Sequence, residues 1–362
     1  MMKPTWAILL TAIVASCGSG SSDMGSGDND TGDNGSGDGS FETLSARYPG
    51  DDGIASDPSV LFFDDFESGW GRLAWPSRDT RYLSMESDAS GAHSGSRYLR
   101  STVTEADLEA DSDGYISSQA GVTFEPTDQV YIRFHTQFVD VAPNPHHWVR
   151  FSASDGDWDS SGLANTLPPG DRGFWFDLDI NNDDIFNFYA YWYKMRSGWC
   201  NDGSTTPGCE GQQGGSPYFY GNVFRPADQQ PLQRDQWQCI EVMAKANTPG
   251  SSDGELALWV NGEKVGHFRP GEPEGTWLRA TFHVDGCNYS ACTDPAPFEG
   301  FDFRSSDRVR FDKFVLDAYY QLNTYRNKRQ ALIDKGLSPS GTQTILYDDV
   351  VVATRRVGCR VD

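Results

Sequence analysis

The strand-like segment from Val130 to Val139 carries three side chains that could do chemistry together. Arg133, His135 and Gln137 alternate with apolar residues there, and side chains at alternate positions of a strand share a face. This face is either the wall of a concave groove in a β-sandwich or a solvated outer surface. A guanidinium and an amide can neutralise a carboxylate, and an imidazole can transfer a proton. We therefore regard the three residues as candidate catalytic groups.

A second candidate group surrounds two adjacent histidines, His146 and His147, that precede another strand-like segment. Alternation places Trp148 and Arg150 on one face of that segment, and we expect Arg150 to face the groove. His147 is either buried or lies at the entrance of the strand, and one of the two histidines is expected to be structural. His147 and Arg150 are thus candidate catalytic residues, and Trp148 is a candidate substrate contact.

Aromatic side chains form a third group. Tyr189, Tyr191 and Tyr193 share one face of a segment that spans Asn187 to Lys194, and Trp175 lies on a neighbouring segment. Aromatic rings can stack on the apolar faces of sugars, and a tyrosine hydroxyl can transfer a proton. We expect Tyr191 to be catalytic and the other three to bind substrate, with core packing as the alternative role for some of these rings.

The elements that position these residues are predicted to be strands. Runs with an alternating apolar pattern recur between Leu61 and Thr354, and turn-rich stretches separate them. Asn261-Gly262 is a strong hairpin signal, and helical periodicity is confined to the segment from Tyr325 to Lys335. The sequence therefore predicts an all-β fold, a jelly-roll β-sandwich of two antiparallel sheets.

The N-terminal region has the features of an export signal. Residues 1–16 contain Lys3 and an apolar run that is too short to span a bilayer, as in a signal peptide. Val14 to Cys17 resembles a bacterial lipobox, which implies lipidation of Cys17; an ordinary secretory leader is the alternative. Gly18 fits sorting to the outer membrane or cell surface. Residues 17–47 are predicted to be a Gly/Ser/Asp tether, and residues 48–362 a single domain.

Charge and cysteine content restrict the partners and the environment. The net charge of −23 argues against nucleic acid and anionic membrane surfaces, so we expect the membrane to be met only through the lipid anchor. Six cysteines follow Cys17, an even number that suits disulfides in an exported protein. The alternative, a zinc site, lacks the close two-residue spacing of zinc ribbons. Short spacings favour two local pairs and leave a third, long-range one: Cys200–Cys209, Cys287–Cys292 and Cys239–Cys359.

Several segments together resemble concanavalin A-like jelly-roll polysaccharide lyases, including alginate and glucuronan lyases and the cellulose-induced Cip proteins. The segment from Trp237 to Gly250 is the most specific of these. The others are Tyr48–Asp51, Leu61–Glu67, His93–Leu99, Leu258–Gly262 and Tyr347–Thr354.

The resemblance implies a surface lipoprotein that binds an acidic polysaccharide and cleaves it beside a uronic acid by β-elimination, with no organic cofactor. It adds Lys245 as a candidate substrate contact, and we expect Arg133, Arg150, Lys194 and Lys245 to make the groove basic. The motif of two glutamates and an aspartate that retaining β-glucanases carry is absent from the sequence. A non-catalytic glycan-binding lipoprotein and an exported structural module are the alternatives, and the oligomeric state is left open.

The resemblance also implies a structural calcium ion. In related sandwiches an acidic residue of the first strand and an aspartate of the last strand share Ca²⁺, and oxygen ligands suit this ion. Acidic strand ends in a very acidic protein are the alternative explanation. The matching residues are Asp65, Glu67, Asp348 and Asp349.

Overall fold

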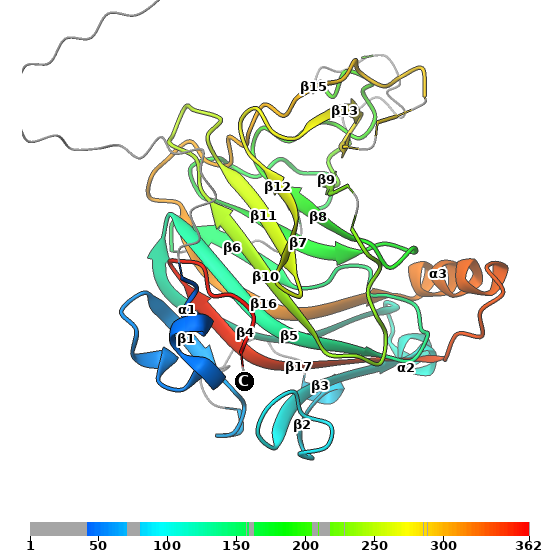
Figure 1. The fold of residues 1–362 in the computed structure, drawn as a ribbon. Coiled ribbons are helices and arrows are strands. Elements are labelled where there is room, and N and C mark those ends of the chain that lie inside the picture. Colours follow the sequence, from blue (N-terminus) through cyan, green and yellow to red (C-terminus); the bar gives the residue numbers. More distant parts are fainter. Residues whose placement is uncertain are drawn as a thin grey trace, which may run out of the picture. The chain divides into compact units, whose positions relative to one another are not determined.

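The structure is a computed structural model that describes residues 42–70, 80–156, 158, 163–204, 209, 218–227, 229–284, 286–287 and 289–361. In this part of the chain two large sheets pack face to face, and helices are few and short (Figure 1). The expected jelly-roll β-sandwich is confirmed. None of the described helices is long and apolar enough to cross a membrane.

Sheet A has eight strands among the described residues, and all of its pairings are antiparallel. β17 pairs with two strands on the same side: its first part, from Thr342 to Tyr347, pairs with β3, and its last part, from Val350 to Ala353, pairs with β1 (Val60–Asp64). The remaining order is β12 (Glu263–Phe268), β11 (Glu255–Val260), β10 (Gln238–Lys245), β5 (Gln129–Val139), β17 (Thr342–Ala353), β3 (Arg97–Thr104) and β2 (Leu83–Ser87).

Sheet B has nine strands in the same described ranges, and its one parallel pairing joins β14 to β9. Its order is β15 (Ala296–Pro297), β13 (Glu274–Leu278), β14 (Thr281–His283), β9 (Asn222–Arg225), β8 (Phe186–Tyr191), β7 (Gly173–Ile180), β6 (Arg150–Ser154), β16 (Arg310–Gln321) and β4 (Tyr115–Thr127).

The main core lies between the sheets and is rich in aromatic rings. Phe134 and Phe138 of β5 both meet the ring of Trp148, with centroid distances of 5.6 and 5.2 Å. The indole N–H of Trp148 donates a hydrogen bond to the hydroxyl of Tyr347 at 2.9 Å. Trp148 is fully buried, so it stabilises the core and does not contact a ligand. The expectation that it shares a groove face with Arg150 is wrong, because β6 begins only at Arg150.

Three α-helices lie at the ends of the sandwich within the described residues: α1 (Leu44–Arg47), α2 (Glu105–Ala110) and α3 (Leu322–Asp334). The side chain of Thr104 caps α2 and forms a capping box with Asp107. α3 continues directly from β16, so the helix predicted from Tyr325 onward begins three residues earlier.

The ends of the described chain pack against each other on sheet A (Figure 1). The backbone N–H of Ser45 donates to the carbonyl of Val357 at 2.8 Å. The backbone N–H of Gly50 donates to the carbonyl of Val361 at 2.7 Å. Leu44 is fully buried beside Val357. α1, which precedes the domain boundary predicted at Tyr48, therefore packs on the rest of the domain.

The three expected disulfides are present: Cys200–Cys209, Cys239–Cys359 and Cys287–Cys292. Cys239–Cys359 closes a loop with a sequence separation of 120 and joins β10 to the C-terminal tail, whereas Cys287–Cys292 spans 5. A disulfide stabilises chiefly by restricting the unfolded chain, and this effect grows with loop length. We therefore expect Cys239–Cys359 to stabilise this fold more than either of the other two disulfides.

Replacing Cys239 and Cys359 together by alanine should lower the free energy of unfolding by about 5 kcal/mol, because a very long loop is freed. The matched change of Cys287 and Cys292 should cost about 2 kcal/mol. Urea unfolding followed by tryptophan fluorescence measures both. Equal losses of unfolding free energy in the two double variants would show that Cys239–Cys359 stabilises the fold no more than Cys287–Cys292.

Candidate active site

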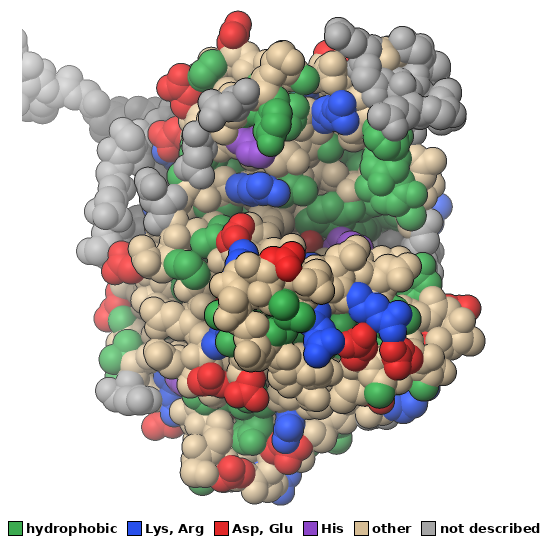
Figure 2. Space-filling view, turned by 90° about the vertical axis from the view of Figure 1, so that its right-hand side faces the viewer, with side chains coloured by type: hydrophobic (Ala, Val, Ile, Leu, Met, Phe, Trp, Pro, Cys, Tyr) green, Lys and Arg blue, Asp and Glu red, His purple; other side chains and the backbone are tan. Residues whose placement is uncertain are grey.

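A groove lies on the face of sheet B that points away from sheet A, with a cavity volume of about 620 Å³. Figure 2 shows the side of the molecule where histidine and hydrophobic side chains line a hollow. The groove is lined by Tyr115, Ser117, Gln119, His146, His147, Arg150, Leu163, Ala164, Trp175, Tyr189, Tyr191, Tyr220, Asp317, Tyr319 and Gln321.

Strand alternation explains this lining. In β7, Phe174, Phe176 and Leu178 belong to the core, so Trp175 and Asp177 point to the opposite face. The same alternation sends the groove residues of β4, β8 and β16 away from the core. Each of these strands thus contributes polar and aromatic side chains to one continuous surface.

His147 is held by a buried carboxylate. Its Nδ1 lies 3.1 Å from Asp179 Oδ2, and the other oxygen of Asp179 accepts the backbone N–H of Trp148 at 2.8 Å. Because Nδ1 faces the carboxylate, Nε2 is at the opposite edge of the ring. Burial is the largest single influence and lowers the pKa of His147, but the charge and hydrogen bond of Asp179, together with the charge of Asp177, raise the pKa above its usual value. His147 is therefore oriented for proton transfer through Nε2.

Arg150 is anchored on one edge and open on the other. Its Nε and Nη2 donate to the two oxygens of Asp177 at 2.8 and 3.0 Å, and its guanidinium lies 4.1 Å from the ring centroid of Trp175. Nη1 makes no hydrogen bond to any residue that the structure describes. Burial raises the pKa of Asp177 to about 6, although Arg150 opposes this shift. The pair presents a fixed cationic edge that suits a carboxylate ligand.

Tyrosine hydroxyls supply proton donors. Burial raises the pKa of Tyr191 to about 12 and that of Tyr319 to about 12, so both are protonated at neutral pH. The hydroxyl of Tyr319 has no hydrogen-bond partner among the described residues. Tyr189 donates its proton to the carbonyl of Tyr220, so it is the less available donor. The hydroxyl of Tyr191 donates only a long hydrogen bond, of 3.4 Å, to the carbonyl of Phe219, so Tyr191 and Tyr319 are the more available donors for a leaving oxygen.

The groove residues of β4 and β16 were not among the site residues predicted from the sequence. Gln119 Nε2 donates to Asp317 at 3.1 Å, and Ser117 donates to the same carboxylate at 3.0 Å. Burial raises the pKa of Asp317. The signal was the alternation of Tyr115, Ser117 and Gln119 with smaller or apolar residues, which predicts a strand with one polar face.

The structure brings together five of the residues predicted from the sequence: His147, Arg150, Trp175, Tyr189 and Tyr191. It places the other candidates outside the groove. Lys245 pairs with Glu255 on sheet A at 2.8 Å. Tyr193 donates to Asp302 at 3.1 Å, and Lys194 pairs with the same carboxylate, beyond the end of β8.

Arg133, His135 and Gln137 lie on β5 of sheet A, on the face away from sheet B, so the expectation that they line the groove is corrected. Arg133 has no exposed surface and pairs with Asp51 at 2.5 Å. Its burial arises because the N-terminal segment and the C-terminal tail cover this face. Alternation predicted the shared face correctly but could not tell which face of the sandwich it was.

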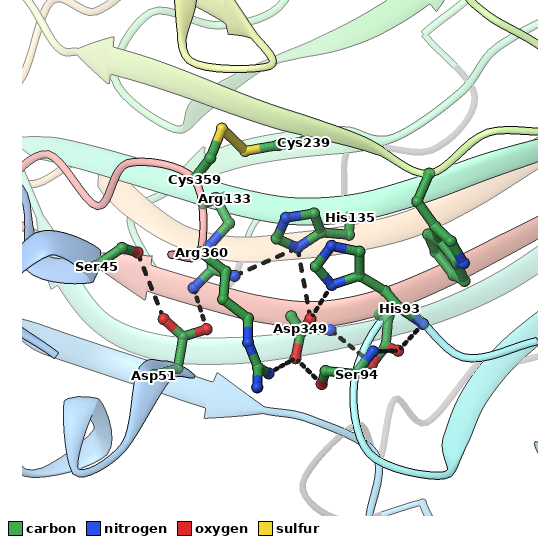
Figure 3. Close-up of polar contacts among 12 residues, drawn as sticks. Ser45, Asp51, His93, Ser94, Arg133, His135, Cys239, Asp349, Cys359 and Arg360 are labelled. Carbon is green, nitrogen blue, oxygen red and sulfur yellow. Dashed lines mark hydrogen bonds and ion pairs between the residues drawn. A yellow bond between two sulfur atoms is a disulfide. The ribbon is translucent and has the colours of Figure 1, made fainter. Parts of the chain in front are cut away.

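His135 belongs to a polar cluster under the chain ends (Figure 3). Its ring stacks on that of His93 with centroids 3.6 Å apart, and Asp349 lies below both rings. Asp349 Oδ1 also accepts from Arg360 at 3.0 Å, which ties β17 to the tail. Burial is the largest influence on His135, and its pKa is well below the usual value. These contacts give the cluster a structural role in fixing the ends of the chain.

Two groups of described residues have ligand atoms close enough for a metal ion: His93–His135–Asp349 and His147–Asp177–Asp179. Arg360 binds Asp349, and Arg150 occupies both oxygens of Asp177, so a guanidinium already neutralises a carboxylate in each group. Neither arrangement fits a cation site.

The predicted calcium ligands are not gathered into such a group. Glu67 accepts hydrogen bonds from Ser96 and Arg97, and Asp65 accepts from the amide of Glu67. Asp348 accepts backbone N–H groups of His93 and Ser94. Burial raises the pKa of Asp348 to about 8, with a further contribution from the adjacent Asp349. Calcium binding stays a prediction, and lipidation of Cys17 falls outside the described residues.

Comparisons with solved structures find proteins of the group that the motifs resemble. An endo-β-1,4-glucuronan lyase from the fungus Trichoderma reesei has 13% identity and a TM-score of 0.44, over 82% of this chain and 96% of that one. The alginate lyase vAL-1 from Chlorella virus has 14% identity and a TM-score of 0.46, over 82% and 100%. The cellulose-induced protein Cip1 has 17% identity and a TM-score of 0.41, over 82% and 99%.

No protein-family model matches this chain, and no curated protein sequence matches it. At these identities and TM-scores, the structural similarities support no conclusion about activity. The fold follows from the strand order of this chain itself, and its function has to be argued from the groove.

Replacing Asp179 by asparagine should lower the pKa of His147, because the charge and hydrogen bond of Asp179 are lost and Asp177 alone then opposes the effect of burial. NMR titration of the histidine ring resonances measures the shift. Asp183→Asn is the matched control, since Asp183 is exposed and pairs with Lys335. An unchanged pKa in the Asp179 variant would show that this carboxylate does not control His147.

Proposed function

We propose that the groove binds an acidic polysaccharide and cleaves it beside a uronic acid by β-elimination. One observation carries the proposal: His147 and Arg150 are each bound to a carboxylate, and both lie beside the buried Asp177. Asp177 binds Arg150 through both oxygens, and it lies 3.7 Å from His147 Nδ1. A proton-transfer group and a carboxylate-binding group are thus fixed side by side.

The first requirement of β-elimination is to neutralise the uronate carboxylate, since this acidifies the adjacent C5–H bond. The open edge of Arg150 is suited to this task, because Asp177 and Trp175 hold the guanidinium in place. Gln119 is a second hydrogen-bond donor for the uronate carboxylate. Its Nε2 carries two hydrogens and donates one of them to Asp317. Both donors line the same groove.

The second requirement is a base and an acid. In its neutral form, His147 takes the C5 proton through Nε2. The electrons of the C5–H bond form the C4–C5 double bond, and the C4–O4 bond breaks. Tyr191 or Tyr319 protonates the departing O4. The products are an unsaturated uronate and a new hydroxyl on the neighbouring sugar, and no water is consumed.

Hydrolysis by two carboxylates fits the described groove less well. A glycosidase needs one carboxyl group as a proton donor and another as a nucleophile or base. Here Arg150 holds Asp177, His147 and an amide hold Asp179, and Ser117 and Gln119 hold Asp317. Each carboxylate therefore positions another group.

A second candidate is glycan binding without cleavage, and the aromatic lining favours it. The rings of Tyr115 and Tyr220, which line the groove, are 44% and 40% exposed, and the stacked pair of Trp175 and Tyr191 lies buried beneath the groove. Such rings suit the apolar faces of sugars whether or not a bond is broken. The two functions share the binding step, and only the first of them yields an unsaturated product.

We also propose that the protein is an exported lipoprotein, held at the outer membrane or cell surface by acyl chains on Cys17. The resemblance of Val14–Cys17 to a lipobox supports this, and so does the short apolar run before it. More than one chain on a single residue gives stable anchoring. The substrate would then be met close to the cell.

Incubation with uronate polysaccharides should produce an absorbance near 235 nm, roughly where unsaturated uronates absorb. Tyr191→Phe should lower kcat by about 10²-fold, because a proton donor is lost. Tyr193→Phe, on the same segment but bonded to Asp302, should retain wild-type activity.

The proposal of cleavage fails if no substrate gives an absorbance rise while the protein is still retained on immobilised glycans. Glycan binding alone would then be the function. Equal effects of the Tyr191 and Tyr193 substitutions would instead show that Tyr191 is not a proton donor in the reaction.

Cells that express the chain with radiolabelled palmitate should incorporate label into the wild-type protein, while Cys17→Ala should abolish incorporation and release the protein from membranes. Cys200 is a poor control because it is disulfide-bonded, so Ser16→Ala serves instead. Label that persists in the Cys17 variant would rule out this anchor.

A further inference from the structure

The groove has little positive charge for a site that would bind a polyanion. Among its described lining residues Arg150 is the single Lys or Arg, and Asp317 adds a negative charge. His147 adds one positive charge when protonated, whereas burial and the neighbouring His147 lower the pKa of His146 to about 4. The lining therefore offers one permanent cationic edge, which is enough for one carboxylate.

The other basic residues expected in the groove are used elsewhere. Arg133 is buried against Asp51, Lys194 pairs with Asp302, and Lys245 pairs with Glu255. The segments 157–162 and 205–217, which lie close in sequence to groove residues Leu163 and Tyr220, contain no Lys or Arg. A second uronate beside the one at Arg150 thus has no evident cationic partner among the described residues.

One end of the groove is acidic. Tyr115 and Gln321 line both the groove and an adjoining hollow of about 250 Å³, which also includes Asp111 and Asp113. Glu109 lines this hollow too, but Arg326 pairs with it. The two remaining aspartates would repel a carboxylate bound at this end, an effect that is strongest at low ionic strength.

Aromatic rings flank the charged centre. The ring of His147 stacks between Tyr189 at 4.7 Å and Tyr319 at 5.9 Å, and Tyr319 stacks on Tyr115 at 6.0 Å. Tyr115 is 44% exposed at the acidic end. Exposed rings bind the apolar faces of neutral sugars without any need for charge. The row of rings therefore suits uncharged sugar units on either side of one uronate.

We propose that the substrate is a heteropolysaccharide in which single 4-linked uronates are flanked by neutral sugars, and not a polyuronate. The inference rests on the proposed β-elimination and names its substrate class. The uronate binds at Arg150, and its neutral neighbours lie against the aromatic rings.

The test compares kcat/KM per 4-linked uronate for the full chain on two sets of polymers. Hyaluronan and gellan carry isolated uronates between neutral sugars, while alginate, glucuronan and polygalacturonate are polyuronates. We expect at least tenfold higher kcat/KM on a member of the first set. Equal or higher values on a polyuronate would overturn the inference and leave β-elimination standing. No absorbance rise with any polymer would overturn β-elimination itself, and the inference with it.

A charge reversal tests the acidic end separately. Asp113→Lys should raise kcat/KM on any polyuronate that is cleaved by about three- to tenfold at low salt, and should have little effect on the heteropolymers. Glu125→Lys, an equal change at the other end of β4, should not alter the preference. If Asp113→Lys changes neither set, the acidic end does not determine specificity and the inference loses that support.

Discussion

Three buried carboxylates beneath the groove determine how the rest of the site is arranged. Asp177, Asp179 and Asp317 are at most 9% exposed, and an ionised carboxylate is costly to bury unless donors surround it. Each of these carboxylates accepts hydrogen bonds from a groove residue. The need to pair the buried charges therefore orients His147, Arg150 and Gln119. The positions of the reactive groups are thus a consequence of charge burial in sheet B.

The same requirement acts on sheet A with a different result. Arg133 and Asp349 are also buried, but Arg133 pairs with Asp51 of the N-terminal segment, and Asp349 contacts Arg360 of the tail as well as His93 and Ser94 before β3 (Figure 3). The cluster on sheet A is covered by the chain ends and fixes them. The cluster on sheet B lies in a groove that is open to solvent, so it can bind a ligand. The two sheets therefore use buried ion pairs for two purposes, and access to solvent distinguishes them.

The sequence was sufficient for the fold class, for the three disulfides and for five of the groove residues. It was not sufficient to assign faces. Arg133 and Arg150 both sit in strands with alternating patterns, but only the packing of distant segments decides that one is covered and the other open. Trp148 was misassigned because it precedes its strand. Gln119 was overlooked because its strand, β4, is long and its polar face contains small residues that give a weak pattern.

The junction of the two chain ends also has a mechanical meaning. The chain enters the domain at α1, which hydrogen-bonds to the tail, and the tail is bonded covalently to β10 through Cys239 and Cys359. A pull on the N-terminal side is therefore transmitted first to sheet A. Sheet B, with the groove, receives that force less directly, through the apolar core, through hydrogen bonds such as that of Trp148 to Tyr347, and through the chain segments that link the sheets. A domain held by its N-terminal end could thus bear tension while the spacing of its reactive groups stays unchanged.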